Sequence, residues 1–141
     1  MRRIFMQALG TLTVLFIMLC GVFLFLLLRA PVFEKGESYT FYLGADSSSL
    51  FISSTSPARD RLFLSVRGES VQYAGNQLEK LQQKYRAKLL FCEDVCGISN
   101  YYFSSPLLGG GVLLNGYTVN LHIAVSAEKT VAGTPIIFGG F

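Results

Sequence analysis

The sequence predicts an α+β protein with one N-terminal transmembrane helix, followed by a small, mainly antiparallel sheet with one amphipathic helix. Three observations support this fold class. Residues 4–28 contain no charged side chain. Short runs with period-two alternation of apolar residues begin at residue 38, as expected for half-buried strands. One later segment, residues 76–86, has apolar residues at helical spacing instead. Strands joined by short turns and covered by a helix pack as an α+β domain.

The N-terminal apolar run is long enough to cross a bilayer. As a helix it would extend roughly 37 Å, against about 30 Å of hydrocarbon. Arg2 and Arg3 precede it, so the positive-inside rule places the N-terminus in the cytoplasm and the C-terminal domain outside. A cleaved signal peptide has a shorter apolar run of about 7 to 15 residues, so the pattern favours an uncleaved anchor. We therefore expect a cytoplasmic tip and anchor at residues 1–29, a juxtamembrane linker at 30–37 and an extracytoplasmic α+β domain at 38–141.

Composition excludes several classes of protein. Of 141 residues, 51% are hydrophobic and only 15% are charged, which is too apolar for a cytosolic or a disordered chain. Lys and Arg number 12 against 9 Asp and Glu, but three of the arginines flank the apolar run. The rest of the chain is therefore neutral, whereas nucleic-acid binding needs clustered cations. The expected partners are the lipid bilayer and a protein of the envelope, with no nucleic acid.

Nine strands are expected in the domain. Each is predicted either by alternation of apolar and polar residues or by a run of β-forming residues between two turn signals. Pro135 places the last run at a sheet edge or a bulge, because proline cannot donate to a ladder. The expected strands are residues 38–43, 50–53, 61–66, 71–73, 88–93, 99–104, 112–114, 117–125 and 136–138.

The helix and one hairpin are the most specific local predictions. Asn76 and Glu79 have capping-box spacing at the start of the helix. The helical spacing of apolar residues also continues backwards towards residue 69, so a longer helix beginning there is the alternative. Asn115-Gly116 lies between two apolar runs, which is typical of a two-residue hairpin turn with positive φ at both positions. We expect this hairpin and the long strand after it to form the structural centre of the domain.

Two cysteines bracket a turn predicted at residues 93–96. Such a turn would bring Cys92 and Cys96 within disulfide range, and both lie on the oxidising side of the membrane. A disulfide is therefore the favoured interpretation. Two unpaired thiols, or a metal or redox site, are the alternatives, although neither the spacing nor the neighbouring residues define a coordination set.

Tyr102 and His122 are the candidate contact residues. On a strand Tyr102 faces away from Tyr101 and Phe103, so one aromatic ring is expected on the outer face. His122 falls on the polar parity of its strand, which predicts a partly exposed structural histidine. No nucleophile is tied to it by the local sequence.

The C-terminal block, Asn120-Leu-His-Ile-Ala124 followed by Gly133-Thr-Pro-Ile-Ile137, resembles the ending of small membrane-anchored proteins of spore-forming Gram-positive bacteria, and it is similar to the YwmB family. The resemblance implies an N-terminal apolar segment, an α+β fold likened to that of the TATA-binding protein, and a bacterial cell-surface setting. It implies no enzymatic activity and carries no site residues across.

Taken together, the sequence predicts a single-pass, membrane-anchored interaction or assembly module of the bacterial envelope, with sporulation as a possible setting. We expect it not to be an enzyme, and we identify no catalytic, cofactor-binding or metal-binding residue in it. The alternative is a small thiol-dependent or hydrolytic envelope enzyme using Cys92 or Cys96.

Overall fold

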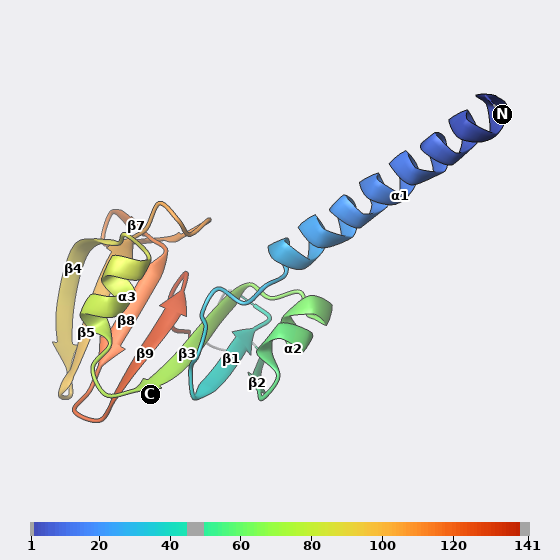
Figure 1. Ribbon diagram of the computed structural model, residues 1–141. Coiled ribbons are helices and arrows are strands. Elements are labelled where there is room, and N and C mark those ends of the chain that lie inside the picture. Colours follow the sequence, from blue (N-terminus) through green and yellow to red (C-terminus); the bar gives the residue numbers. More distant parts are fainter. Residues whose placement is uncertain (1, 45–49, 139–141) are drawn as a thin grey trace. The chain divides into compact units, whose positions relative to one another are not determined.

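The computed structural model describes residues 2–44 and 50–138, and the chain divides into two compact units, Met1–Ala30 and Pro31–Phe141 (Figure 1). The first unit is the helix α1 (Arg2–Leu28). In the second, the described residues form α2 (Pro57–Phe63), α3 (Leu78–Lys84), β1 (Ser38–Tyr42), β2 (Phe51–Ser54), β3 (Gly68–Ala74), β4 (Lys88–Val95), β5 (Ile98–Ser104), β6 (Val112–Leu114), β7 (Tyr117–Val119), β8 (Leu121–Val125) and β9 (Lys129–Thr134). The predicted α+β class is confirmed, with one short helix more than expected.

Seven of these strands form one sheet in the order β2-β1-β3-β9-β8-β5-β4, and every neighbouring pair is antiparallel. The hairpins β4–β5 and β8–β9 account for two of the pairings. The connection through α3 carries the chain from β3, inside the sheet, to β4 at its far edge. Within the part of the chain that the structure describes, β2 and β4 are the two edge strands, and no strand pairs with the outer side of either.

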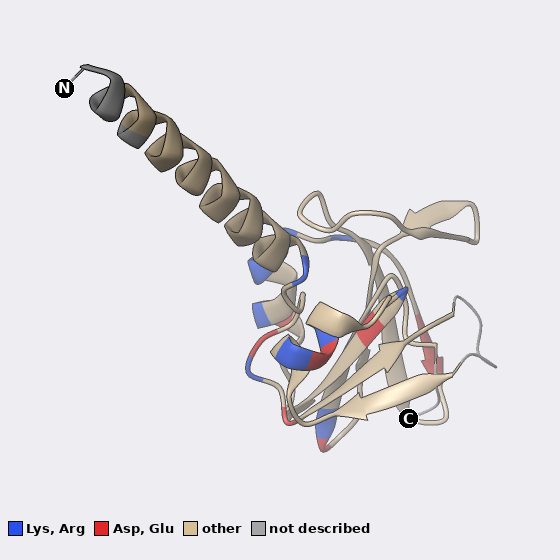
Figure 2. Ribbon diagram, turned by 90° about the vertical axis from the view of Figure 1, so that its right-hand side faces the viewer, with Lys and Arg blue, Asp and Glu red and all other residues tan. Residues whose placement is uncertain are grey.

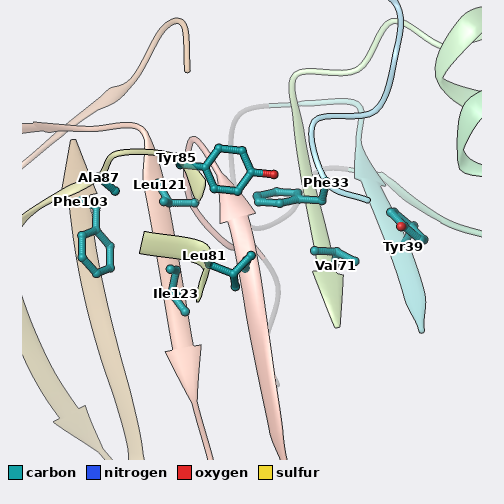
Figure 3. Close-up of a cluster of buried hydrophobic side chains, with 10 residues drawn as sticks. Phe33, Tyr39, Val71, Leu81, Tyr85, Ala87, Phe103, Leu121 and Ile123 are labelled. Carbon is teal, nitrogen blue, oxygen red and sulfur yellow. The ribbon is translucent and has the colours of Figure 1, made fainter. Parts of the chain in front are cut away.

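The main core lies on the sheet face that α3 covers. Val71, Ala132 and Ile123 stand opposite one another across β3, β9 and β8, so all three share this face. Leu81 of α3 and Tyr85 just after it pack onto them, as the close-up shows (Figure 3). Each fully buried side chain of this size is worth about 1.5 to 3 kcal/mol. The amphipathic stripe predicted for the helix is thus the stripe that closes the core.

The C-terminal segment does not form the strand predicted at residues 136–138. β9 ends at Thr134 and lies inside the sheet between β3 and β8, so the expectation of an edge strand at Pro135 was wrong. The segment turns back over the second face of the sheet. There the ring of Phe138 meets the ring of Tyr42 edge-on, with centroids 5.4 Å apart.

The strand predicted at residues 61–66 is also wrong, because part of it is the helix α2. Pro57 stands in the first turn, where a missing N–H costs nothing. The backbone N–H of Asp60 bonds Ser56 O at 3.0 Å, and that of Leu64 bonds Asp60 O at 2.9 Å. The Ser54 hydroxyl also donates to Asp60 Oδ2 at 2.6 Å. These local bonds prevail over the short alternation of leucines in the same segment.

The predicted helix at residues 76–86 is present but shorter, as α3. The longer alternative beginning near residue 69 is excluded, because β3 occupies that segment. The predicted capping box is replaced by a different start: Gln77 is the N-cap, and Asn76 Oδ1 accepts the backbone N–H of Leu78 at 3.0 Å.

The predicted Asn-Gly hairpin is confirmed, but it is not the structural centre of the domain that we expected. Asn115 and Gly116 have φ of 49° and 80°, as a type I′ turn requires. β6 and β7 form a two-stranded sheet of their own, so they are not the structural centre of the domain. The predicted long strand is divided at Asn120 into β7 and β8, and the Asn120 side chain bonds the backbone of Ser105 and Leu108.

The predicted linker at residues 30–37 belongs to the folded domain. Phe33 is 1% exposed, and its ring meets that of Tyr85 edge-on at 5.7 Å. The Tyr85 hydroxyl donates to Val32 O at 2.9 Å. The domain therefore begins at Pro31, only three residues after the last residue of α1.

Candidate functional site

The helix α1 presents an apolar surface on every side. Its segment Leu9–Leu28 has a mean hydropathy of 2.8 over 20 residues, enough for a membrane span by length and composition. Polar side chains in it are satisfied locally: the hydroxyls of Thr11 and Thr13 donate to the carbonyls of Gln7 and Leu9. A membrane anchor and a signal sequence both have this form.

Tyr102 and His122 lie side by side on the sheet face opposite α3. Their rings stack at 4.3 Å with an interplanar angle of 18°, and Phe91 of β4 stacks on the other side of Tyr102 at 4.4 Å. The Tyr102 hydroxyl donates to Glu93 Oε1 at 2.6 Å. Desolvation, followed by the nearby Glu93 carboxylate, raises the pKa of Tyr102 to about 12, so this hydroxyl stays protonated. The predicted orientation of Tyr102 is confirmed by its pairing with His122.

His122 is not the partly exposed residue that its parity predicts, because it is only 6% exposed. It therefore offers no contact surface. The backbone N–H of Ile137 donates to its Nδ1 at 3.3 Å, which leaves Nε2 to donate to Asn100 Oδ1 at 3.0 Å. Desolvation lowers the pKa of His122 to about 4, against a smaller opposing effect of Glu93. The neutral imidazole thus connects β8 by hydrogen bonds to Asn100 of β5 and to Ile137 after β9.

Cys92 and Cys96 are unbonded and exposed. The turn between β4 and β5 lies later than predicted: Val95 pairs with Ile98, and the two residues between them are Cys96 and Gly97. β4 therefore runs straight through Cys92, and the predicted turn at residues 93–96 that would bring the two sulfur atoms together is not formed.

The structure does not bring Cys92 and His122 together either. Cys92 is opposite Tyr101, which is opposite Ile123 on the α3 face, whereas His122 points to the other face. No hydrogen-bonded thiol–imidazole pair of the kind used in nucleophilic catalysis arises from these positions.

Glu69 is a buried charged residue that the sequence analysis missed. It is 1% exposed on β3, and its Oε1 accepts the backbone N–H groups of Val32 at 2.6 Å and Phe33 at 3.0 Å. Its Oε2 lies 3.4 Å from Nε of Arg61 on α2, without hydrogen-bond geometry. Desolvation raises the pKa of Glu69, while its two backbone donors and Arg61 act in the opposite direction. Glu69 thus binds the first residues of the domain to the middle of the sheet.

The edge strand β4 is the longest strand and is accessible along most of its length. Val95 is 52% exposed and Leu89 is 43% exposed. The pair that flanks the two-residue turn is hydrogen-bonded, and such pairs alternate along an antiparallel ladder. The N–H and C=O groups of Cys92 and Asp94 therefore point away from β5, into the open edge. An extended segment could add to the sheet here as another strand.

Within residues 2–44 and 50–138, no group of three or more His, Cys, Asp or Glu side chains is placed to hold a metal ion. No protein-family model, no curated protein and no solved structure matches this chain.

Proposed function

We propose that this protein is a single-pass, membrane-anchored module of the bacterial envelope whose extracytoplasmic domain binds another envelope protein without catalysing a reaction. The observation that carries the proposal is a helix long and apolar enough to span a membrane, followed by a folded domain in which no described strand covers the outer side of β4. The resemblance of residues 120–124 and 133–137 to the YwmB family, proposed from the sequence alone, is the reason for choosing an envelope setting.

The anchor is supported by the surface of α1. Side chains such as Phe16, Leu19 and Leu24 are between 57% and 68% exposed, and water would solvate them poorly. Lipid covers such a surface on every side at once. Arg2 and Arg3, at the N-terminal end of α1, favour a cytoplasmic N-terminus.

A reporter that is active only outside the cytoplasm, fused after Phe141, tests this topology. We expect an active fusion that sediments with membranes. Activity released into the medium would identify α1 as a cleaved signal, and activity confined to the cytoplasm would reverse the orientation.

The open edge of β4 supports binding of an extended segment of the partner protein. Edge strands expose unpaired backbone groups and are the usual place for strand addition. The other edge strand, β2, is half as long, which leaves fewer groups for pairing.

Substitutions at Cys92 test the edge with a matched control. Cys92→Pro removes the outward-pointing N–H and is tolerated at an open edge, whereas Cys92→Ser keeps the N–H and removes only the thiol. A partner recovered by crosslinking with the wild type and with Cys92→Ser, but lost with Cys92→Pro at an unchanged melting temperature, would support the proposal. Equal recovery of the partner by all three proteins would show that the partner does not bind at the edge of β4. Loss of the partner with Cys92→Ser would favour a thiol-dependent role.

A further inference from the structure

The first residues of the folded domain are fixed to the sheet and follow the end of α1 closely in the chain. Val32 and Phe33 are bound by Glu69 and Tyr85, and only three residues separate Val32 from Leu28, where α1 ends. Four extended residue steps cover at most about 14 Å. A headgroup layer is roughly 5 to 8 Å thick. In a membrane-anchored chain, the surface around Val32 is therefore held at or just above the headgroups.

Two segments of the domain lie beside Val32. An open pocket of about 410 Å³ is lined by Val32, by Arg61 of α2, and by residues 108–112, which lead into β6. In Figure 1 the β6–β7 hairpin lies at the opposite end of the sheet from the β4–β5 turn. The end of the domain that the tether holds near the bilayer is thus formed by α2 and by the segment from residue 107 to the β6–β7 hairpin.

These two segments carry exposed apolar side chains. Phe63, at the end of α2, is 77% exposed, Leu113 of β6 is 75% exposed, and Leu107 is 56% exposed. The chain from residue 104 to residue 127 contains no Asp, Glu, Lys or Arg, and Figure 2 shows the β6–β7 hairpin free of charged residues. α2 adds the exposed cation Arg59 beside Phe63. Apolar side chains next to arginine are typical of surfaces that enter a bilayer interface.

We propose that this end of the domain docks on the outer surface of the membrane that holds α1, with Leu113, Leu107 and Phe63 inserted among the headgroups. The inference rests on the proposed anchoring. The partner is the bilayer itself, because a tether this short keeps the surface beside Val32 within reach of the interface. Docking would also leave the β4–β5 turn, at the far end of the sheet, directed into the aqueous space.

A fluorescent label on Leu113→Cys tests the docking. The full chain, with its three native cysteines replaced by serine, is labelled with an environment-sensitive fluorophore. It is reconstituted in vesicles of phosphatidylcholine and phosphatidylglycerol without any other protein. We expect a blue shift of emission, and a loss of emission when lipids with a quencher near the headgroup are included.

The matched control is the same label on the native Cys96, with Cys20 and Cys92 replaced, since Cys96 lies in the β4–β5 turn. We expect it to keep the emission seen in water and to resist the lipid quencher. A second position, Leu107→Cys, repeats the test should Leu113→Cys lower the melting temperature.

Vesicle flotation separates the docking from the anchor. Protein that fails to float with the vesicles would contradict the anchoring itself. Protein that floats while the labels at positions 113 and 107 keep the emission seen in water would overturn the docking alone. A blue shift without lipid quenching would also overturn it, because the label would then be covered by protein.

Discussion

Acid should destabilise the domain through His122, which the fold holds in its neutral form. The imidazole is buried between Tyr102, Asn100 and the backbone of Ile137. Its pKa falls from about 6.5 in the unfolded chain to about 4 in the fold. Above pH 6.5 neither state is protonated, so this stabilisation is fully present. As the pH falls below 6.5, His122 is protonated in the unfolded chain but stays neutral in the folded one. The free energy of unfolding therefore decreases until about pH 4, where the folded protein is protonated as well.

The size of the effect follows from the two pKa values. The full difference corresponds to about 3 kcal/mol, of which about 2 kcal/mol is lost at pH 5. A small domain has roughly 5 to 15 kcal/mol of stability in all. The raised pKa of Glu69 acts in the opposite direction, because protonation relieves the cost of burying that carboxylate. Comparing the wild type with a variant that changes only His122 removes the Glu69 contribution, because it is the same in both proteins.

The assay is urea unfolding of the full chain in detergent at pH 7.5 and at pH 5, for the wild type and for His122→Gln. An uncharged amide cannot titrate, so the variant should lose about 2 kcal/mol less than the wild type between the two pH values. His122→Gln should be the less stable protein at pH 7.5, since it gives up the stacked ring. Identical pH dependence in the two proteins would refute the assignment of His122 as a buried neutral group.

Three further predictions follow from the described contacts. Glu69→Ala should destabilise the domain by about 3 to 5 kcal/mol, because it leaves the buried N–H of Phe33, the half-buried N–H of Val32 and the Arg61 charge without their acceptor. Glu79→Ala, on the exposed part of α3, should change the stability by no more than about 0.5 kcal/mol in the same urea titration. Gly133→Ala should lower the melting temperature, since a Cβ there would lie 2.7 Å from Ile137 Cγ1 and 2.9 Å from the Ile137 backbone nitrogen. Gly109→Ala is the control: its Cβ would meet nothing within 4 Å, so the melting temperature should stay unchanged. Mass spectrometry after alkylation without reductant should show both thiols of the β4–β5 hairpin modified in the folded protein; protection of both until reduction would mean that they form a disulfide.

Local patterns predicted the strands and turns whose determinants lie next to one another in the chain. Asn115-Gly116 specifies its turn through backbone preferences of two adjacent residues, and the turn is where it was predicted. The alternation around Tyr102 placed that ring on the correct face for the same reason. The helix α2 was missed because Leu62 and Leu64 alternate like a strand, while Pro57 and the helical hydrogen bonds determine the fold.

Residues whose surroundings come from distant segments were placed wrongly or overlooked. Glu69 bonds residues 36 and 37 positions earlier, and a single carboxylate in a strand is usually read as facing solvent. His122 does lie on the second face of the sheet, as its parity predicts. Over His122 that face is closed by Ile137, which lies in the segment 136–138 that was predicted to be a strand. The sequence signals for this turn were Gly133 and Pro135. In the structure, Ile137 comes so near that a Cβ on Gly133 would lie 2.7 Å from its Cγ1.

The attachment of Val32 and Phe33 to the sheet determines where a peptidase can cut without damage. Cleavage at or before Ala30 would keep Phe33 in the core and both backbone bonds to Glu69, so the released fragment would stay folded. Cleavage a few residues later, after Lys35, would leave Phe33 attached to α1 and held in the domain only by noncovalent contacts, free to dissociate with that helix. Loss of Phe33 would empty the space that its ring fills, so cleavage at this second site would destabilise the fragment that it releases.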